Sequence, residues 1–435
     1  MRISLRGGLH FLDMRVDDGR AVLDDRSVAT SSDGTAQDGT SRPGPDDRLA
    51  LSFRGRIAGL DVLRGVAILM VLFFHGFDGA ESYQEWHGPF RFFVFLTHFG
   101  AEGVHLFFVL SGFLITGILL DSKGKPDYYR SFYIRRCLRI VPAYLLMVAT
   151  LKIWGGISWN YVVASLLFVA NMASLTGART EEYGFWSLAV EEQFYLVWPL
   201  VLRNLRTNTT IRVVIAGLLL SPLARALVAF KTHGTGDAYF KTWANVDYLF
   251  YGALVAVWLR EHGSKVDEVR KLARILLAIS IVTVPLAMCA WSRSLPMGAE
   301  CLMSGFGRLP LAWLFVALLL LALVSHSSSQ ESRGLFHGPL AKVASFYGFI
   351  SYGLYLVHPF VWSVYSGWAR FRPDPTLGNL QLIVRFVVGV GASTLIAFLS
   401  RKYFEDFFLR QRIGLRREPP SHGDKRAAST GASVR

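Results

Sequence analysis

Two side chains that can carry charge, Arg64 and His75, stand in the otherwise apolar stretch 63–75. They are eleven residues apart, which on an α-helix means a return to within roughly 20° of the same face and a separation of about 16 Å along the axis. A guanidinium is a fixed cation, whereas an imidazole can take up a proton near neutral pH. The pair predicts a helix face with a cation at one end and a general base at the other. In the alternative reading, Arg64 reaches lipid phosphates and His75 is an ordinary interfacial residue.

Two adjacent carboxylates, Glu191 and Glu192, lie within the apolar segment 186–195, and Asp247 is a further acid in an apolar segment. Bare charges facing lipid cost too much free energy, so these acids need partners. Neighbouring side chains on a helix point about 100° apart, so the two glutamates cannot enter one small site together. We expect one to pair with a buried cation and the other to orient a histidine or bind a substrate. A purely structural ion pair is the alternative.

Three arginines, Arg135, Arg136 and Arg139, cluster at the start of a predicted span. Such clusters commonly anchor a helix end on the cytoplasmic side of a membrane. The functional alternative is a phosphate clamp, because guanidinium groups match phosphate oxygens with paired hydrogen bonds. Both readings stay open.

Two further groups of side chains are candidates for substrate contact. Glu102 and His105 are one helical turn apart and are able to share a proton or a substrate hydroxyl. Tyr352, Tyr355 and His358 follow one another at spacings of three, which places them on one helical face.

The apolar residues come in blocks long enough to cross a bilayer. Of the 435 residues, 52% are hydrophobic and only 18% are charged, which is too little charged surface for a soluble chain of this length. A helix needs about 20 apolar residues to cross roughly 30 Å of hydrocarbon, and stretches such as 106–120 and 311–324 are free of charge. The sequence therefore predicts an all-α polytopic membrane protein. The small residues Ser111 and Gly112 predict close packing of the second span against a neighbour.

Eleven hydrophobic segments are candidate spans. They lie near residues 58–77, 98–120, 139–155, 159–176, 186–203, 211–230, 244–260, 273–292, 309–325, 344–368 and 379–400. Basic residues collect in cytoplasmic loops, and this rule places both termini in the cytoplasm and leaves one net crossing between about 156 and 203. One of the two segments there is therefore expected to be re-entrant or interfacial, which leaves roughly ten transmembrane helices.

The two ends of the chain differ from this membrane region. Residues 1–49 are rich in Asp, Arg, Gly and Ser, lack the apolar centre of a signal peptide, and are expected to be disordered. Residues 50–405 form the predicted transmembrane domain, and residues 406–435 form a predicted basic, disordered tail. No stretch is left over for a second folded domain.

Charge and cysteine content exclude some functions. The net charge of +14 is explained by loops that anchor helices, and no basic-aromatic module suggests a nucleic-acid partner. Cys137, Cys289 and Cys301 are scattered singly, which predicts neither a disulfide framework nor a metal site.

The order of these motifs resembles the membrane-bound acyltransferase-3 family, whose members O-acylate bacterial polysaccharides, lipopolysaccharide, peptidoglycan and some antibiotics. The resemblance runs over about residues 56–403. It rests on Arg64 followed by His75, on Phe-Phe-Val-Leu-Ser-Gly-Phe-Leu-Ile at 107–115, on Arg-x-x-Arg-Ile-x-Pro-x-Tyr at 136–144, and on Trp-Ser-Leu-x-Val-Glu-Glu-Gln-Phe-Tyr at 186–195. Members often have an aspartate where this chain has His105.

On the donor side, the resemblance implies an acyl-coenzyme A substrate, typically acetyl-coenzyme A, and makes Arg64 and His75 essential. We expect some of Arg135, Arg136 and Arg139 to hold the donor phosphates. Arg64 would then steady the pantetheine end or the thioester oxygen.

On the acceptor side, we expect His75 to act as general base on a hydroxyl of a carbohydrate or glycolipid, or first to take the acyl group itself. Glu191 or Glu192 would orient His75 or bind the sugar. The remaining predicted substrate-binding residues are Glu102, His105, Tyr355 and His358. The expected protein is a standalone transferase surrounded by lipid in the bacterial cytoplasmic (inner) membrane.

The alternative function is transport of a lipid-linked sugar or small anion. A transporter would have its charges along a continuous route through the bilayer and would consume no thioester. The intramembrane charges here cluster in the first five segments, which favours one reaction centre.

Overall fold

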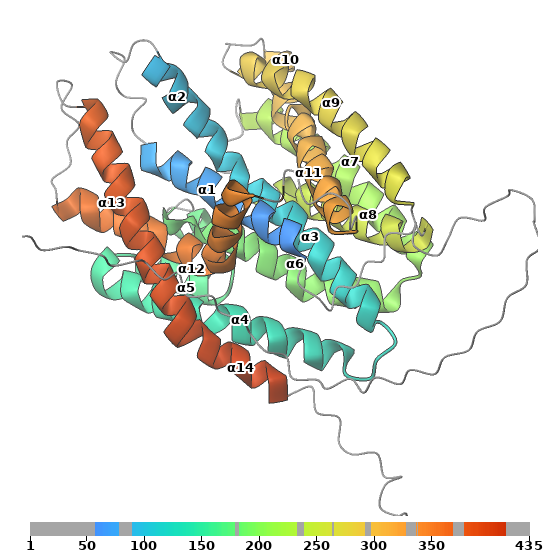
Figure 1. The fold of residues 1–435 in the computed structure, drawn as a ribbon, viewed down its shortest axis with the longest axis horizontal. Helices are drawn as coiled ribbons and strands as arrows, with labels where there is room; N and C mark the ends of the chain where they lie inside the picture. The colour runs from blue at the N-terminus through green and yellow to red at the C-terminus, as the bar shows by residue number, and fades with distance from the viewer. Residues whose placement is uncertain are drawn as a thin grey trace, which may run out of the picture. The chain divides into compact units, whose positions relative to one another are not determined.

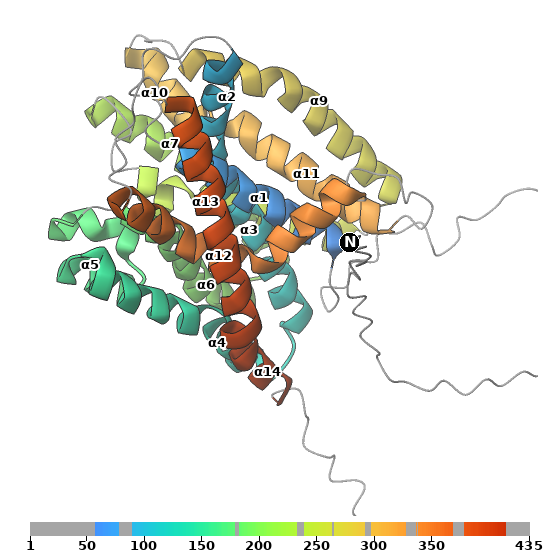
Figure 2. The same cartoon turned by 60° about the vertical axis from the view of Figure 1, so that its left-hand side comes forward.

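The computed structural model (Figures 1 and 2) describes residues 57–77, 89–178, 182–232, 239–262, 265–291, 297–327, 336, 338–368 and 378–414. The regular elements of these residues are helical, as predicted. The α-helices are α1 (Ala58–Phe77), α2 (Pro89–His98), α3 (Gly103–Ser122), α4 (Tyr128–Thr150), α5 (Trp159–Leu166), α6 (Phe185–Asn204), α7 (Thr207–Thr232), α8 (Val246–His262), α9 (Val266–Trp291), α10 (Met297–Phe306), α11 (Leu309–Ser327), α12 (Pro339–Trp368), α13 (Gly378–Leu399) and α14 (Asp406–Gly414). Short 3-10 turns cover Phe99–Glu102, Ala170–Thr176, Glu182–Gly184 and Thr242–Ala244, and π-helical turns cover Leu151–Gly155 and Ser400–Glu405.

Eight helices in the described part of the chain are long and apolar enough to cross a bilayer. They are α1, α3 with the end of α2, α4, α7, α9, α11 with α10, α12 and α13. α6 falls outside this set because Glu191, Glu192 and Gln193 lower its hydropathy, and α8 has only 17 residues. The chain is therefore a multi-pass membrane protein. The predicted ten crossings and the cytoplasmic position of both termini stay predictions.

The predicted span 159–176 is not one helix. α5 has eight residues, a length of about 12 Å, which is far short of roughly 30 Å of hydrocarbon. The chain then turns at Phe168, whose φ of 54° lies in a region that bulky residues rarely adopt. The 3-10 turn Ala170–Thr176 follows and ends at Gly177 with a φ of 79°. A segment of this shape is too short to cross a bilayer, and its re-entrant or interfacial placement stays a prediction.

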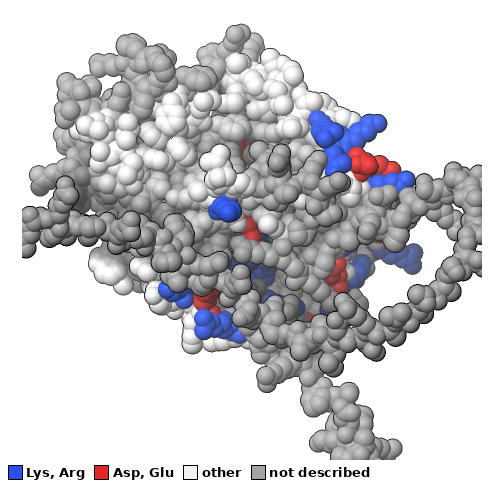
Figure 3. Space-filling view, viewed as in Figure 1, with Lys and Arg blue, Asp and Glu red and all other residues white. Residues whose placement is uncertain are grey.

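Burial divides the helices into an inner and an outer set. The most apolar window of α3 is 72% buried, whereas that of α9 is 17% buried and that of α13 is 22% buried. Helices that are apolar on all sides and still exposed are typical of a lipid-facing position. On the face shown in Figure 3, the described residues in the upper part of the view are mostly uncharged, and charged side chains appear in a few clusters.

Glycines let two pairs of helices touch at the backbone. A Cβ on Gly65 of α1 would lie 1.7 Å from the carbonyl oxygen of Ala344, and one on Gly348 of α12 would lie 1.9 Å from that of Asp61. A Cβ on Gly112 of α3 would lie 1.9 Å from a carbonyl oxygen of α8. The close packing predicted for Gly112 is therefore confirmed. α13 packs against both α12 and α1 (Figures 1 and 2).

A buried ion pair joins α7 to α8. Asp247 is bound by Arg225 through two hydrogen bonds of 2.9 and 3.1 Å, and both side chains are almost fully buried. Arg225 also donates to the carbonyl oxygens of Ala244 (2.6 Å) and Gly305 (3.0 Å). A buried pair is tolerated when its remaining hydrogen-bonding groups are satisfied in this way. The contacts of Asp247 therefore hold α7 and α8 together, which is a structural role.

The start of α4 and the start of the C-terminal tail differ from the boundaries that the sequence predicts. α4 begins at Tyr128 rather than near residue 139, so the three predicted phosphate-binding arginines lie within a helix and not at its start. Residues 406–414 of the predicted disordered tail form α14, which packs against α4. The remainder of that tail and the segment 1–49 lie outside the described residues.

Candidate active site

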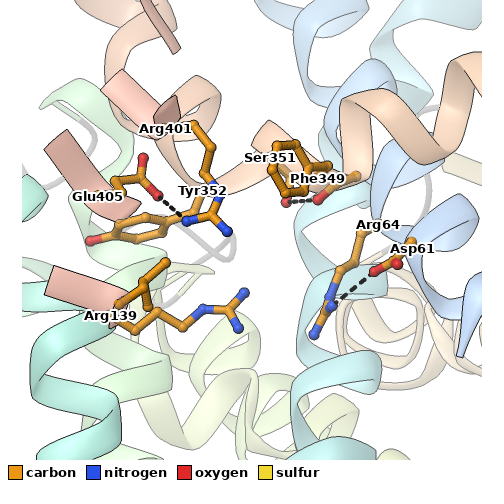
Figure 4. Close-up of a pocket in the computed structure, with 10 residues that line it drawn as sticks. Asp61, Arg64, Arg139, Phe349, Ser351, Tyr352, Arg401 and Glu405 are labelled. Atoms are coloured by element: carbon orange, nitrogen blue, oxygen red, sulfur yellow. Dashed lines mark hydrogen bonds and ion pairs between the residues drawn. The ribbon is translucent and has the colours of Figure 1, made fainter. Parts of the chain in front are cut away.

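A pocket of about 280 Å³ lies between α1, α4, α12 and the π-helical turn before α14 (Figure 4). We refer to it as the arginine pocket. Its lining residues are Asp61, Arg64, Arg139, Gly348, Phe349, Ser351, Tyr352, Arg401, Glu405 and Leu409. The guanidinium groups of Arg64, Arg139 and Arg401 extend from different helices toward the space between them (Figure 4). With the carboxylates of Asp61 and Glu405 included, the pocket has a positive balance.

Acidic neighbours orient two of these arginines. Arg64 Nη1 donates to Asp61 Oδ1 at 3.3 Å. Arg401 Nη1 is 2.9 Å from Asp406 Oδ1, and its guanidinium lies 4.7 Å from the centre of the Phe349 ring. Each of these contacts engages one part of a guanidinium that has five N–H donors. Both arginines therefore keep donors for an anion.

Arg401 was not among the predicted site residues. It lies in the π-helical turn Ser400–Glu405, directly after an apolar helix, and π-helical turns are frequent at functional sites. As a basic residue after a span, it fits the rule for cytoplasmic anchoring equally well. The sequence feature that could have pointed to Arg401 is the pair of nearby acids, Glu405 and Asp406, because a cluster of opposite charges at the end of a span suggests buried ion pairs.

A second pocket of about 100 Å³ shares residues with the first. The shared residues are Arg64, Arg139, Ser351 and Tyr352. We refer to it as the Glu191 pocket, and its other lining residues are Val104, Phe107, Phe108, Ser111, Arg136, Ile140, Ser187, Leu188, Glu191, Tyr195 and Tyr355. The two pockets therefore adjoin each other, and the smaller Glu191 pocket, which Arg401 does not line, has more aromatic side chains in its lining.

Glu191 is held in this pocket by hydroxyl groups. Its Oε1 accepts a hydrogen bond of 2.7 Å from Ser111, which in turn accepts one of 3.0 Å from Tyr195. Arg136 lies 5.1 Å from the centre of the Tyr195 ring and lines the same pocket. Glu192 is not a lining residue, and its Oε1 is buried without a hydrogen-bond partner in the described structure. The two adjacent glutamates therefore have different surroundings, as their 100° separation requires.

His75 lies in the last turn of α1, at the opposite end of the helix from Arg64. Its ring contacts that of His358 of α12. The ring centroids are 5.0 Å apart and the ring planes are inclined at 67°. Nδ1 of His75 is 3.1 Å from the carbonyl oxygen of Val71, and Nδ1 of His358 is 3.0 Å from that of Leu354. Within the residues described here, no group of three His, Cys, Asp or Glu side chains is placed to hold a metal ion.

Tyr355 connects the histidines to the Glu191 pocket. Its hydroxyl is 2.5 Å from Ser187 Oγ and 3.0 Å from the carbonyl oxygen of Gly184, and its ring centroid is 5.6 Å from that of His358. Gly184 has a φ of 70°, a conformation that favours glycine at the start of α6. Tyr352 and Tyr355 line the pocket and His358 follows them on the same face of α12, as their spacing predicts.

Six predicted site residues line neither pocket: His75, His358 and Glu192, described above, and Glu102, His105 and Arg135. Glu102 Oε2 is 2.7 Å from His105 Nδ1, and His105 Nε2 is 3.0 Å from Asn245 Oδ1, so this buried network ties α3 to the start of α8. Burial raises the pKa of Tyr239, which precedes α8 and faces the His105 ring, to about 12. Arg135 donates to a carbonyl oxygen of its own helix and lines neither pocket. A substrate role for these residues stays a prediction.

The fold and this site define a multi-pass helical membrane protein with an arginine-rich pocket among its spans. The profile of the family described as "Acyltransferase domain" matches residues 57–402. The chain therefore belongs to the acyltransferase-3 family.

Named relatives of the chain are bacterial proteins. YrhL of Bacillus subtilis, provisionally named a peptidoglycan O-acetyltransferase, is 29% identical over 376 residues, which are 80% of this chain and 54% of YrhL. Peptidoglycan O-acetyltransferase OatA of Listeria monocytogenes is 28% identical over 81% of this chain and 56% of its own length. O-acetyltransferase OatA of Staphylococcus aureus is 25% identical over 80% and 56%. The chain thus spans a little over half the length of these relatives. No solved structure matches the chain significantly.

Proposed function

We propose that this protein is a membrane-bound O-acetyltransferase that moves an acetyl group from acetyl-coenzyme A to a hydroxyl of a cell-surface polysaccharide. Family membership and the names of the relatives support acetyl transfer and make peptidoglycan the first acceptor to test. The observation that carries the proposal is the arginine pocket, which adjoins the Glu191 pocket and is lined by the same helix that bears His75.

The arginine pocket suits the phosphate groups of the donor. Arg64, Arg139 and Arg401 offer guanidinium groups from separate helices, and such groups bind phosphate oxygens through paired, charge-assisted hydrogen bonds. Arg136 lines the adjoining Glu191 pocket, whereas Arg135 lines neither pocket. In our proposal Arg139 and Arg401 therefore hold phosphate, and Arg135 anchors the helix.

His75 acts as the general base. It removes the proton from the acceptor hydroxyl while that oxygen forms a bond to the thioester carbonyl carbon and the bond from carbon to sulfur breaks. The proton then passes from His75 to the sulfur of the departing coenzyme A. Arg64 is eleven residues away on the same helix, which is about 16 Å, so it does not contact the same atoms. Arg64 consequently binds the donor at its anionic end rather than at the thioester oxygen.

The remaining lining groups lie between these two ends. Glu191 and Ser111 offer a carboxylate and a hydroxyl in the Glu191 pocket, and Tyr355 stands between this pocket and His358. In our proposal they contact the polar middle of the donor. We place the protein in the bacterial cytoplasmic membrane, with the arginine pocket toward the cytoplasm because basic loops are retained on that side.

The test is acetyl transfer by purified protein in nanodiscs with acetyl-coenzyme A and soluble peptidoglycan fragments. Release of free coenzyme A that depends on the fragments, with acetylated fragments in the mass spectrum, is the expected result. His75→Ala should abolish it, and Arg64→Ala and Arg139→Ala should each raise the KM for acetyl-coenzyme A.

Arg135→Ala is the matched control, because it removes a neighbouring arginine of the same helix that lines neither pocket. Full activity of correctly inserted His75→Ala would refute the assignment of the base. Movement of a lipid-linked sugar or small anion across vesicles without thioester consumption would instead establish the transporter alternative.

A further inference from the structure

Two hydroxyl groups of the Glu191 pocket, those of Ser187 and Tyr355, use their protons within the protein. Their oxygen atoms are 2.5 Å apart, a distance that requires a proton between them. Ser187 Oγ is also 3.2 Å, and the Tyr355 hydroxyl 3.0 Å, from the carbonyl oxygen of Gly184, which can only accept. Each hydroxyl has one proton, so one proton lies between the two oxygens and the other goes to the carbonyl. Only lone pairs are left to face the pocket.

The other hydroxyl groups of this lining have their protons committed in the same way. Tyr195 donates to Ser111 at 3.0 Å, and Ser111 donates to Glu191 at 2.7 Å. Ser351 and Tyr352 donate to backbone carbonyl oxygens at 2.9 and 2.7 Å. All six hydroxyls in the described lining therefore offer a ligand acceptors and no donor. Glu191 adds a carboxylate, which can accept up to about four hydrogen bonds.

The side-chain N–H donors of the Glu191 pocket belong to arginines. Arg64 and Arg139 also line the arginine pocket, and Arg136 lies over the Tyr195 ring. A ligand that matches such a lining has N–H groups for the hydroxyls and Glu191, and C=O groups for the arginines. Amides combine both groups. A sugar hydroxyl, which donates or accepts equally well, would not require the protons of the lining to be fixed in one direction.

The acceptors are spaced along α6 as two amides are spaced along the arm of an acyl-coenzyme A. Ser187 and Glu191 are four residues apart and lie on one helical face, a separation of about 6 Å. The two amide nitrogens of the arm are about 5 Å apart when it is extended. The Tyr355 ring centroid is 5.6 Å from that of His358, whose ring contacts His75. Ser187 and Tyr355 are therefore at the thioester end.

We propose that the Glu191 pocket recognises the two amide N–H groups of the donor arm. Ser187 and Tyr355 accept from the amide nearer the thioester, and Glu191 accepts from the other. This rests on the proposed function, which supplies an acyl-coenzyme A as the donor. The three residues determine specificity, because an arm with ester links in place of amides would present lone pairs to lone pairs.

Binding to purified protein in nanodiscs tests this without acetyl transfer. The two probes are coenzyme A and an analogue in which an ester oxygen replaces the N–H of the amide nearer the sulfur. Wild type should bind the analogue about 10- to 100-fold more weakly, the range for a buried polar group without its partner. The double variant Ser187→Ala with Tyr355→Phe should bind coenzyme A more weakly and lose most of this preference.

The matched control is Tyr144→Phe. It removes a buried tyrosine hydroxyl that donates to the carbonyl oxygen of Ser165 at 3.1 Å, and Tyr144 lines neither pocket. This variant should keep the wild-type preference for the amide. All variants are compared by thermal unfolding and size exclusion, so that only folded protein is measured.

Three results would overturn the proposal. Wild type would bind both probes equally, or the double variant would keep the full preference, and in either case the hydroxyls do not recognise the amide. A raised KM for the acceptor in the double variant, with unchanged binding of coenzyme A, would show that they bind the acceptor instead. Coenzyme A still binds to wild type in all three cases, so the proposed function stands. Wild type that binds no coenzyme A refutes the proposed function itself.

Discussion

Gly65 of α1 and Gly348 of α12 lie backbone against backbone, since a Cβ on Gly348 would stand 3.1 Å from the amide nitrogen of Gly65. His75 and His358 each follow their glycine by ten residues, and their rings are 5.0 Å apart. The two helices therefore run parallel and in the same register. One interhelical contact thus sets the position of the histidine pair.

Gly348→Val should separate α1 from α12. The added atoms would meet the carbonyl oxygen of Asp61 at 1.9 Å, and backbone atoms of a packed helix cannot move aside without moving the helix. Overpacking of this kind costs about 1–3 kcal/mol, so a lower melting temperature and loss of transferase activity are expected. Gly391→Ala in α13 is the control, because a Cβ there meets nothing within 4 Å. An unchanged melting temperature for Gly348→Val would contradict the tight contact.

Arg401→Ala should raise the KM for acetyl-coenzyme A with little change in kcat. Hydrogen bonds to charged groups contribute about 1.5–3 kcal/mol, which corresponds to a KM increase of roughly 10- to 100-fold when binding alone is lost. Arg401→Lys should fall between wild type and alanine, because an ammonium lacks the paired donors of a guanidinium. The control is Lys402→Ala, whose exposed ammonium lies 5.2 Å from the Tyr403 ring centre. A similar KM increase in that variant would indicate a general charge effect rather than a contact.

Glu191→Gln should reduce kcat/KM more than Glu192→Gln does. Glu191 lines the pocket and accepts a hydrogen bond from Ser111, whereas Glu192 is not a lining residue. Loss of one charge-assisted contact with substrate corresponds to roughly a tenfold decrease or more. Steady-state kinetics of both variants in nanodiscs show which of them loses more kcat/KM, and their melting temperatures are measured alongside. The reverse order would mean that Glu192 is the glutamate that acts.

Asp247→Ala should destabilise the protein without direct effect on the donor KM. It leaves Arg225 as an unpaired buried cation, and breaking such a pair costs about 3–5 kcal/mol, whereas neither residue lines the arginine pocket or the Glu191 pocket. The double variant Arg225→Met with Asp247→Leu should be far more stable than the sum of the single effects. Thermal unfolding in detergent measures Asp247→Ala, the double variant, and Arg225→Met and Asp247→Leu alone. Additive losses would show that the two residues do not interact as a pair.

Most membrane spans were predictable from the local sequence alone. A block of about 20 apolar residues inside a bilayer must form a helix, because its backbone N–H and C=O groups have no water to bind. The break within 159–176 was not visible in this way, since its residues are as apolar as those of a span. Gln193 of α6 donates to the carbonyl oxygen of Phe168 at 2.9 Å and so holds the irregular turn. Such a contact depends on a helix that lies elsewhere in the sequence.

The site was predictable where a charge stands in an apolar segment, as for Arg64, Arg139 and Glu191, because each such charge needs a polar surrounding. Their common pocket depends on the packing of several helices, which spacing along one helix does not reveal. His358 was predicted to bind substrate, but its contact with His75 joins residues far apart in the chain. The expectation that Glu191 or Glu192 orients His75 stays a prediction, and the structure places the ring of His358 beside that of His75.

Arg64 and His75 are borne by one continuous helix, so their separation is set by helical rise and not by a loop. On the proposed function, a donor anchored at its anionic end must carry its thioester along a span of about 16 Å to reach the base. Only a long, thin arm can do this between packed helices. The site would therefore select donors by the length of that arm before it selects them by acyl group. A thioester with the anchor but a shorter arm would bind well and never react.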